Sequence, residues 1–186
     1  MTLTDLIAQS LREPRVAARG LLDMGVPVQA SWATLVACIC LGVVITFVIS
    51  GGGDVAMIPG LAPISPFFMA AVSLCMSALF VFALFYSGQA LGGQGSIAAT
   101  VMIVAWLQVL QLVGQVVQTL VLLLSPALAA LLSMAILLWL LWVLVSFVQE
   151  VMAFDGVGRA ATALLLAITG VALGLSLILG LLGFGL

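Results

Sequence analysis

The chain contains 186 residues, of which 66% are hydrophobic and only 5% are charged, and its mean hydropathy is +1.47. A soluble domain carries roughly a quarter charged residues, so an excess of apolar side chains this large is stable only in a lipid bilayer. The net charge of −2 at pH 7 argues against a nucleic-acid partner, and the absence of histidine and lysine excludes histidine-based catalysis, histidine-bound metals and Schiff-base cofactors.

Residues 1–24 form a charged segment that is predicted to lie at the membrane surface. Leu3, Ile7 and Leu11 recur at helical spacing. Pro14 interrupts the pattern because proline disfavours helix at the residue before it. We predict one or two amphipathic helices in the membrane interface. The alternative is a cytosolic flap that is ordered by packing on the membrane helices.

Residues 25–186 are predicted to form one transmembrane domain of five helices, each near the ~20 residues that cross a bilayer. The very short connection at Ser125–Pro126 predicts an antiparallel hairpin of the third and fourth spans. The predicted fold class is therefore all-α: a five-transmembrane-helix bundle with an N-terminal amphipathic interfacial helix. The predicted spans cover about residues 28–49, 65–87, 97–124, 127–151 and 160–182.

The arginines predict the orientation of this bundle. Arg12, Arg15 and Arg19 precede the first span, and Arg159 lies between the fourth and fifth spans. With five crossings these two segments share one side of the membrane. Basic residues concentrate on the cytoplasmic side, so the N-terminus is expected inside and the C-terminus outside. The three N-terminal arginines are expected to set this topology and to contact anionic lipid headgroups.

Five stretches occur along the chain in an order that is typical of one family. They are "DLIAQSLREPRVAARGLL" before the first span, "FYSGQALGGQGS" between the second and third, "AWLQVLQLV" in the third, the proline-containing turn into the fourth, and "FVQEVMAFDGVGRA" before the fifth. In these stretches the chain resembles the bacterial branch of the Yip (Ypt/Rab-interacting protein) family. The resemblance implies a five-span fold in a bacterial inner membrane. Eukaryotic relatives bind small prenylated GTPases, but the chain shows no long acidic cytosolic domain of their kind, so this activity is not carried over.

Four glutamines interrupt the apolar third span. At 100° per residue they lie within about an 80° arc, which must face the bundle or line water because an unpartnered amide is unfavourable in hydrocarbon. Either the amides hydrogen-bond to neighbouring helices, or they coat a cavity for a small solute or lipid headgroup. The absence of carboxylates from this span favours the first interpretation over an ion path. Trp106 faces away and is expected to meet lipid. The glutamines are Gln108, Gln111, Gln115 and Gln118.

Small residues on the first and fifth spans predict close helix packing, because small side chains let backbones approach in lipid. Internal packing is favoured over contact with a second copy of the chain. The two packing seams are Thr34, Cys38, Gly42 and Thr46 on the first span, and Gly170 and Gly174 on the fifth.

Glu150 is the acid placed deepest toward the membrane. It is expected to form an interfacial ion pair with Arg159 or with an N-terminal arginine; the alternative is a proton or ligand site.

Three functions follow from these features. The leading hypothesis is a non-enzymatic scaffold or organiser that acts through membrane lipids or other membrane proteins, including a second copy of itself. The alternatives are a small-solute transporter or channel that uses the glutamine face, and an accessory subunit of a larger membrane complex. No catalytic residue, metal site or cofactor is predicted, because no nucleophile has a visible base partner.

Overall fold

The structure, a computed structural model, describes residues 3–51 and 65–181. All regular structure in these two ranges is helical. Five of the helices are long and apolar enough to cross a membrane, which confirms the all-α, five-span fold class. The bounds of these helices differ from the predicted spans by at most three residues, and the largest differences are at the end of α4 (Ala90) and the start of α7 (Val157). The predicted end of the fifth span, residue 182, lies outside the described ranges. The helices are α1 (Leu3–Arg12), α2 (Pro14–Asp23), α3 (Val28–Ile49), α4 (Pro66–Ala90), α5 (Ile97–Leu122), α6 (Pro126–Val151) and α7 (Val157–Leu181).

Serine begins three of the spans. The hydroxyl groups of Ser65, Ser96 and Ser125 each accept a hydrogen bond from the backbone N–H three residues later. Such caps satisfy a donor that the first helical turn leaves free, and a proline at the first position has the φ angle that a helix needs. Both devices occur together at the starts of α4 and α6, so the polar punctuation of the sequence sets where these spans begin.

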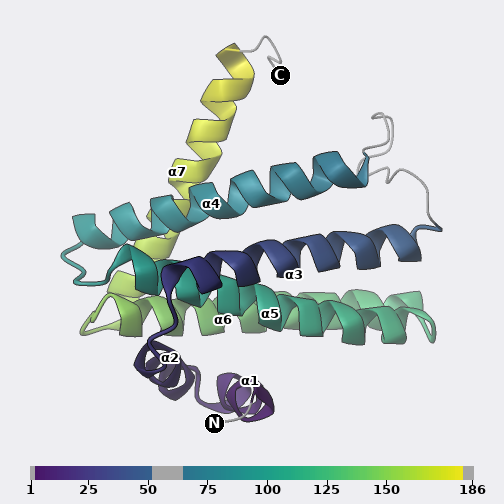
Figure 1. The fold of residues 1–186 in the computed structure, drawn as a ribbon, viewed down its shortest axis with the longest axis horizontal. Helices are drawn as coiled ribbons and strands as arrows, with labels where there is room; N and C mark the ends of the chain where they lie inside the picture. Colours follow the sequence, from purple (N-terminus) through teal and green to yellow (C-terminus); the bar gives the residue numbers. More distant parts are fainter. Residues whose placement is uncertain (1–2, 52–64, 182–186) are drawn as a thin grey trace.

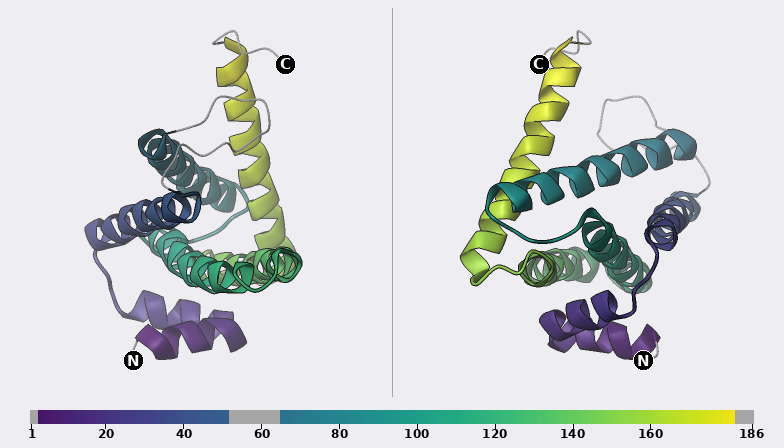
Figure 2. Two further views of the ribbon diagram at one scale, coloured as in Figure 1. Left: turned by 90° about the vertical axis from the view of Figure 1, so that its right-hand side faces the viewer. Right: turned by 60° about the vertical axis from the view of Figure 1, so that its left-hand side comes forward.

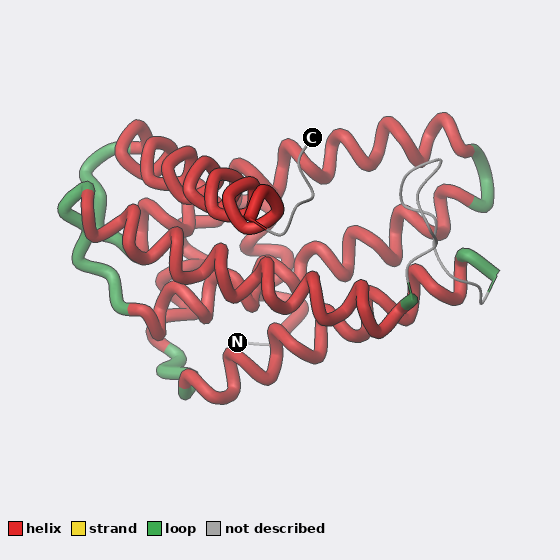
Figure 3. Tube along the Cα trace, turned by 90° about the horizontal axis from the view of Figure 1, so that it is seen from above, coloured by secondary structure: helices red, strands yellow, loops and turns green. Residues whose placement is uncertain are grey.

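Helices α3 to α6 run alongside one another, whereas α7 diverges from them (Figure 1). The connections gather at the two ends of the bundle (Figure 3). The first half of α7 packs closely: Ala160, Ala163, Leu164 and Ala167 are buried, and the hydroxyl of Ser87 in α4 donates to the carbonyl oxygen of Ala163 at 2.8 Å. The second half of α7 leads away from the other four spans (Figure 2).

Helices α1 and α2 form the predicted pair, broken at Glu13–Pro14, and lie across the bundle on the side of α5 and α6 (Figures 1 and 2). Their apolar face is buried there through Leu6, Ala17, Ala18 and Leu21. The helices are thus amphipathic, as predicted, and the apolar stripe packs on protein. Packing on protein agrees with the alternative of an ordered flap, and the position in the membrane interface stays a prediction.

The first half of α5 is the centre of the core. Every residue from Thr100 to Trp106 is buried, because α1 and α2 cover one side of it and neighbouring spans cover the rest. Trp106 is only 8% exposed, and its indole Nε1–H donates to the hydroxyl of Ser10 in α1 at 3.0 Å. The expectation that Trp106 meets lipid is therefore wrong: the side chain does point away from the glutamines, but α1 occupies that side.

Candidate functional site

All four glutamines of α5 line one cavity of about 630 Å³, which we call the amide cavity. Its walls come from α3, α4, α5 and α6, and no described residue of α7 contributes. The glutamines recur every three or four residues and so face one direction along α5. The other polar side chains of the lining, including one thiol, are Cys38, Thr46, Ser73 and Ser133.

A second cavity of about 360 Å³, the side cavity, adjoins the amide cavity. The two share Gln108 and Gln111 from α5 and Leu137 and Leu140 from α6. Apart from these two glutamines and Ser77, the side cavity is lined by apolar side chains of α4, α5 and α6. A hollow that holds several polar side chains and a more apolar hollow therefore lie next to each other between the spans.

Gln115 joins α5 to α3. Its Nε2 donates to the carbonyl oxygen of Gly42 at 3.1 Å and to the hydroxyl oxygen of Thr46 at 3.0 Å. Gly42 allows this contact because a β-carbon at that position would lie 3.2 Å from Gln115 Oε1. The structure thus brings part of the small-residue seam of α3 against the glutamine stripe, while Thr34 lies at an exposed position and bonds within its own helix.

The other three glutamines of the stripe do not join helices through a hydrogen bond of this kind. Among the described residues, the side chains of Gln108, Gln111 and Gln118 make no hydrogen bond with protein, and each borders the amide cavity. An amide without a partner is costly in an apolar environment. The stripe is therefore divided: Gln115 joins two helices, whereas Gln108 and Gln118 are half-buried, Gln111 is exposed, and all three border the cavity without a protein partner among the described residues.

The glycines of α7 have no comparable contact. A β-carbon built on Gly170 or Gly174 would meet nothing within 4 Å in the described structure. The seams of α3 and α7 therefore do not meet, because α7 leaves the bundle before Gly170.

The charged groups lie at the end of the bundle where α6 stops. Arg19 pairs with Glu150, with Nε 2.5 Å from Oε1 and Nη2 3.3 Å from Oε2, and this hydrogen bond and charge raise the pKa of Arg19. Arg15 donates to the side-chain oxygen of Gln149. Glu150 thus pairs with an N-terminal arginine and not with Arg159, which lies 3.8 Å from Asp155. The i, i+4 spacing favours that local contact.

Of the three N-terminal arginines, two therefore contact α6. Both Arg15 and Arg19 connect α2 to the last turn of α6, whereas Arg12 ends α1 at an exposed position. Sequence reasoning allowed for the Arg19 pair but missed Gln149, which is 7% exposed and also donates to the carbonyl oxygen of Phe154. The sequence did offer one indication of this role, because Gln149 is a polar residue in an apolar run directly before a turn.

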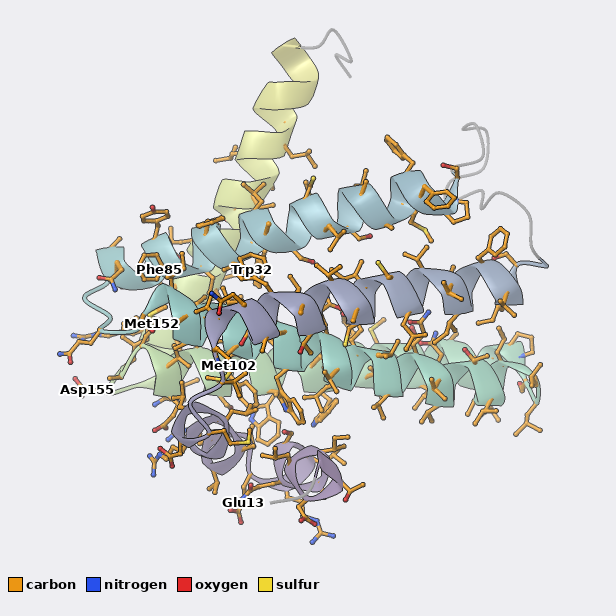
Figure 4. All side chains as sticks on the ribbon, in the orientation of Figure 1. Glu13, Trp32, Phe85, Met102, Met152 and Asp155 are labelled. Atoms are coloured by element: carbon orange, nitrogen blue, oxygen red, sulfur yellow. The ribbon has the colours of Figure 1, made fainter. Side chains whose placement is uncertain are left out.

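Sequence reasoning also missed a glycine cradle around Met152. This side chain is 1% exposed and lies at the end of the bundle where α4 ends (Figure 4). β-Carbons built on Gly88 and Gly95 would lie 2.7 Å from its sulfur, and one on Gly93 would lie 3.1 Å from it. The backbone N–H of Gln94 donates to the Met152 carbonyl oxygen at 3.1 Å. The repeated glycines of "GQALGGQGS" were the signal for this close approach.

The cradle joins two of the stretches that carry the family resemblance, "FYSGQALGGQGS" and "FVQEVMAFDGVGRA", through contacts between distant parts of the sequence. No curated protein and no solved structure matches the chain. The family model of the Yip1 domain matches residues 8–178, from α1 into the second half of α7. This match covers most of the chain, and the five apolar helices agree with it: the chain belongs to the Yip1 domain family of multi-span membrane proteins.

Proposed function

We propose that this protein is a non-enzymatic membrane organiser of the Yip type that acts through a lipid bound in the amide cavity. The observation that carries the proposal is the set of three amides, Gln108, Gln111 and Gln118, that line the cavity without a protein partner. A bound headgroup would supply the missing hydrogen bonds. The cavity volume of about 630 Å³ falls in the usual range for a pocket that encloses a small molecule.

The depth of the cavity also favours a lipid. Gln108 lies 11 residues and Gln118 lies 21 residues after the start of α5 at Ile97, or roughly 16 to 32 Å along the helix axis at 1.5 Å per residue. The cavity therefore extends from the middle of α5 toward its far end at Leu122, along the part of the span that we place in the bilayer. Lipids are the most abundant ligands at that depth, so occupancy would not require a molecule to cross from water.

The proposed orientation follows from the arginines. Arg15 and Arg19 contact the end of α6, and Arg159 follows that end in sequence, so three of the four arginines lie at one end of the bundle. We place this end, and the N-terminus, on the cytoplasmic side because basic residues concentrate there. A bacterial inner membrane remains the proposed location.

Lipid retention tests the proposal. The triple variant Gln108→Met, Gln111→Met and Gln118→Met keeps the length of each side chain, leaves Gln115 in place and removes the free amides. Native mass spectrometry of protein purified in mild detergent should show a bound lipid on the wild type and at least a tenfold loss on the variant. The matched control, Val113→Leu, Val116→Leu and Val117→Leu, changes exposed positions of the same helix and should retain the lipid. A wild type without lipid, or equal retention in the glutamine variant, would refute the proposal.

A small-solute transporter is the second candidate, and the polar side chains in the lining of the amide cavity favour it. Cys38 and Cys40 on α3 discriminate between the two, because Cys38 lines the cavity whereas Cys40 is exposed on the same helix and does not line it. In single-cysteine variants in liposomes, a charged thiol reagent should modify both cysteines equally slowly if lipid fills the cavity. Modification of Cys38 at least ten times faster than Cys40 would instead indicate a water-filled path.

A further inference from the structure

We propose that the amide cavity selects a lipid whose polar end is uncharged and carries a hydroxyl group beside ester carbonyls, as in the diacylglycerol class, over an anionic phospholipid. This inference rests on the proposed function and adds the chemical class of the ligand. Three properties of the two cavities carry it: the absence of charge in the described lining, the hydrogen-bonding capacity of the amides, and the position of the side cavity.

The lining holds no ionisable group that could balance a phosphate. Its only acid–base side chain is the Cys38 thiol, and the described lengths of α3, α4 and α5 contain no Asp, Glu, Lys or Arg. The ionic groups of α6 and α7 lie at the far end of the bundle, where Glu150 is held by Arg19. A phosphate at the depth of the glutamines would lose its hydration without gaining a cation, which is strongly unfavourable in low dielectric.

The free amides instead match a hydroxyl group. Each glutamine side chain offers two donors and an acceptor oxygen, and a hydroxyl group is itself both donor and acceptor. A phosphate oxygen would use only the amide donors and would leave the acceptor oxygens of Gln108, Gln111 and Gln118 unpaired. Ser73 and Ser133 add hydroxyl groups to the same lining, so the cavity offers both donors and acceptors to a polar end that has both functions.

The side cavity provides a place for an acyl chain. It shares Gln108 and Gln111 with the amide cavity, and it continues between apolar side chains that include Phe80, Leu107 and Leu144. A molecule with its polar end at the glutamines and its apolar end in the side cavity would satisfy both linings. That arrangement describes an amphiphile, not a free polar solute.

Two photoactivatable probes with the same diazirine-bearing acyl chains, a diacylglycerol and the corresponding phosphatidic acid, test the inference, because they differ by one phosphate. In nanodiscs of phosphatidylcholine, we expect the diacylglycerol probe to label the α4, α5 and α6 segments that line the side cavity at least ten times more than the phosphatidic acid probe. Unlabelled diacylglycerol should compete. The double variant Gln108→Met and Gln111→Met should lose the preference, and the control Val116→Leu and Val117→Leu should keep it.

The other outcomes separate the two proposals. Equal labelling by both probes that falls in the glutamine variant would overturn the headgroup class and leave lipid binding in place. Diacylglycerol labelling that is indifferent to the glutamine variant would also overturn the headgroup class, because the amides would then play no part in selection. No labelling of the cavity segments by either probe would overturn the headgroup class as well, whereas lipid retained by the wild type in native mass spectrometry would still support lipid binding.

Discussion

Replacement of Gly95 by alanine should lower the free energy of unfolding by about 1 to 3 kcal/mol, the range for overpacking of a well-packed core. The new β-carbon would lie 2.8 Å from the backbone oxygen of Val151 and 2.7 Å from the sulfur of Met152. The methionine could adjust, but the carbonyl belongs to the last turn of α6, so the turn before α5 would have to move. Loss of helical signal and tertiary fluorescence in a denaturing-detergent titration would measure the effect.

The control for this substitution is Gly158→Ala. Gly158 lies in the first turn of α7, and a β-carbon there would meet nothing within 4 Å in the described structure. Alanine is also the better helix former, so the control should be neutral or slightly stabilising. If both variants unfolded at the same detergent concentration, the glycine cradle around Met152 would not be a stability determinant.

Replacement of Trp106 by alanine should destabilise the protein by about 3 kcal/mol or more, as expected when a large buried side chain is truncated. The indole is 8% exposed and donates to the Ser10 hydroxyl in α1, so its removal leaves a cavity under α1 and breaks the hydrogen bond that holds that helix. Release of α1 should make the chain at Arg12 more accessible, and limited trypsin digestion should therefore cleave there faster in the variant.

Trp142→Ala is the matched control for Trp106→Ala. Trp142 is 50% exposed on α6, so its truncation removes little packed surface, and neither unfolding nor tryptic cleavage at Arg12 should change by a comparable amount. Faster cleavage in Trp142→Ala to the same degree would show that α1 responds to general loosening of the bundle and not to loss of the Trp106 contact.

The spans could be predicted closely because lipid imposes a length and a composition on each of them. Hydropathy located their interiors, and serine, proline and glycine located their ends. Ser125–Pro126 predicted the start of α6 to within one residue. The last residue of α4 and the first residue of α7 each lie three residues beyond the predicted bound, because the polar sequence on both sides of the Met152 contact continues in helical conformation.

The candidate site was predictable only as a face of one helix. Helical periodicity put the four glutamines on one arc, but a single sequence does not say which helix stands opposite each residue. Gln115 meets Gly42 while Gln111 meets a cavity. The same limit explains Trp106, whose direction was predicted and whose neighbour was not, and Glu150, whose partner Arg19 lies 131 residues away in sequence.

The divergence of α7 has a consequence for how the proposed site would fill. No described residue of α7 lines either cavity, so in the proposed site the hydrocarbon of the bilayer would complete the enclosure that the four other spans leave open. A lipid would then enter by lateral diffusion within the leaflet, without an aqueous intermediate. Occupancy of the cavity would then follow the mole fraction of that lipid in the membrane, and the fraction of protein with bound lipid would change with the lipid composition around it.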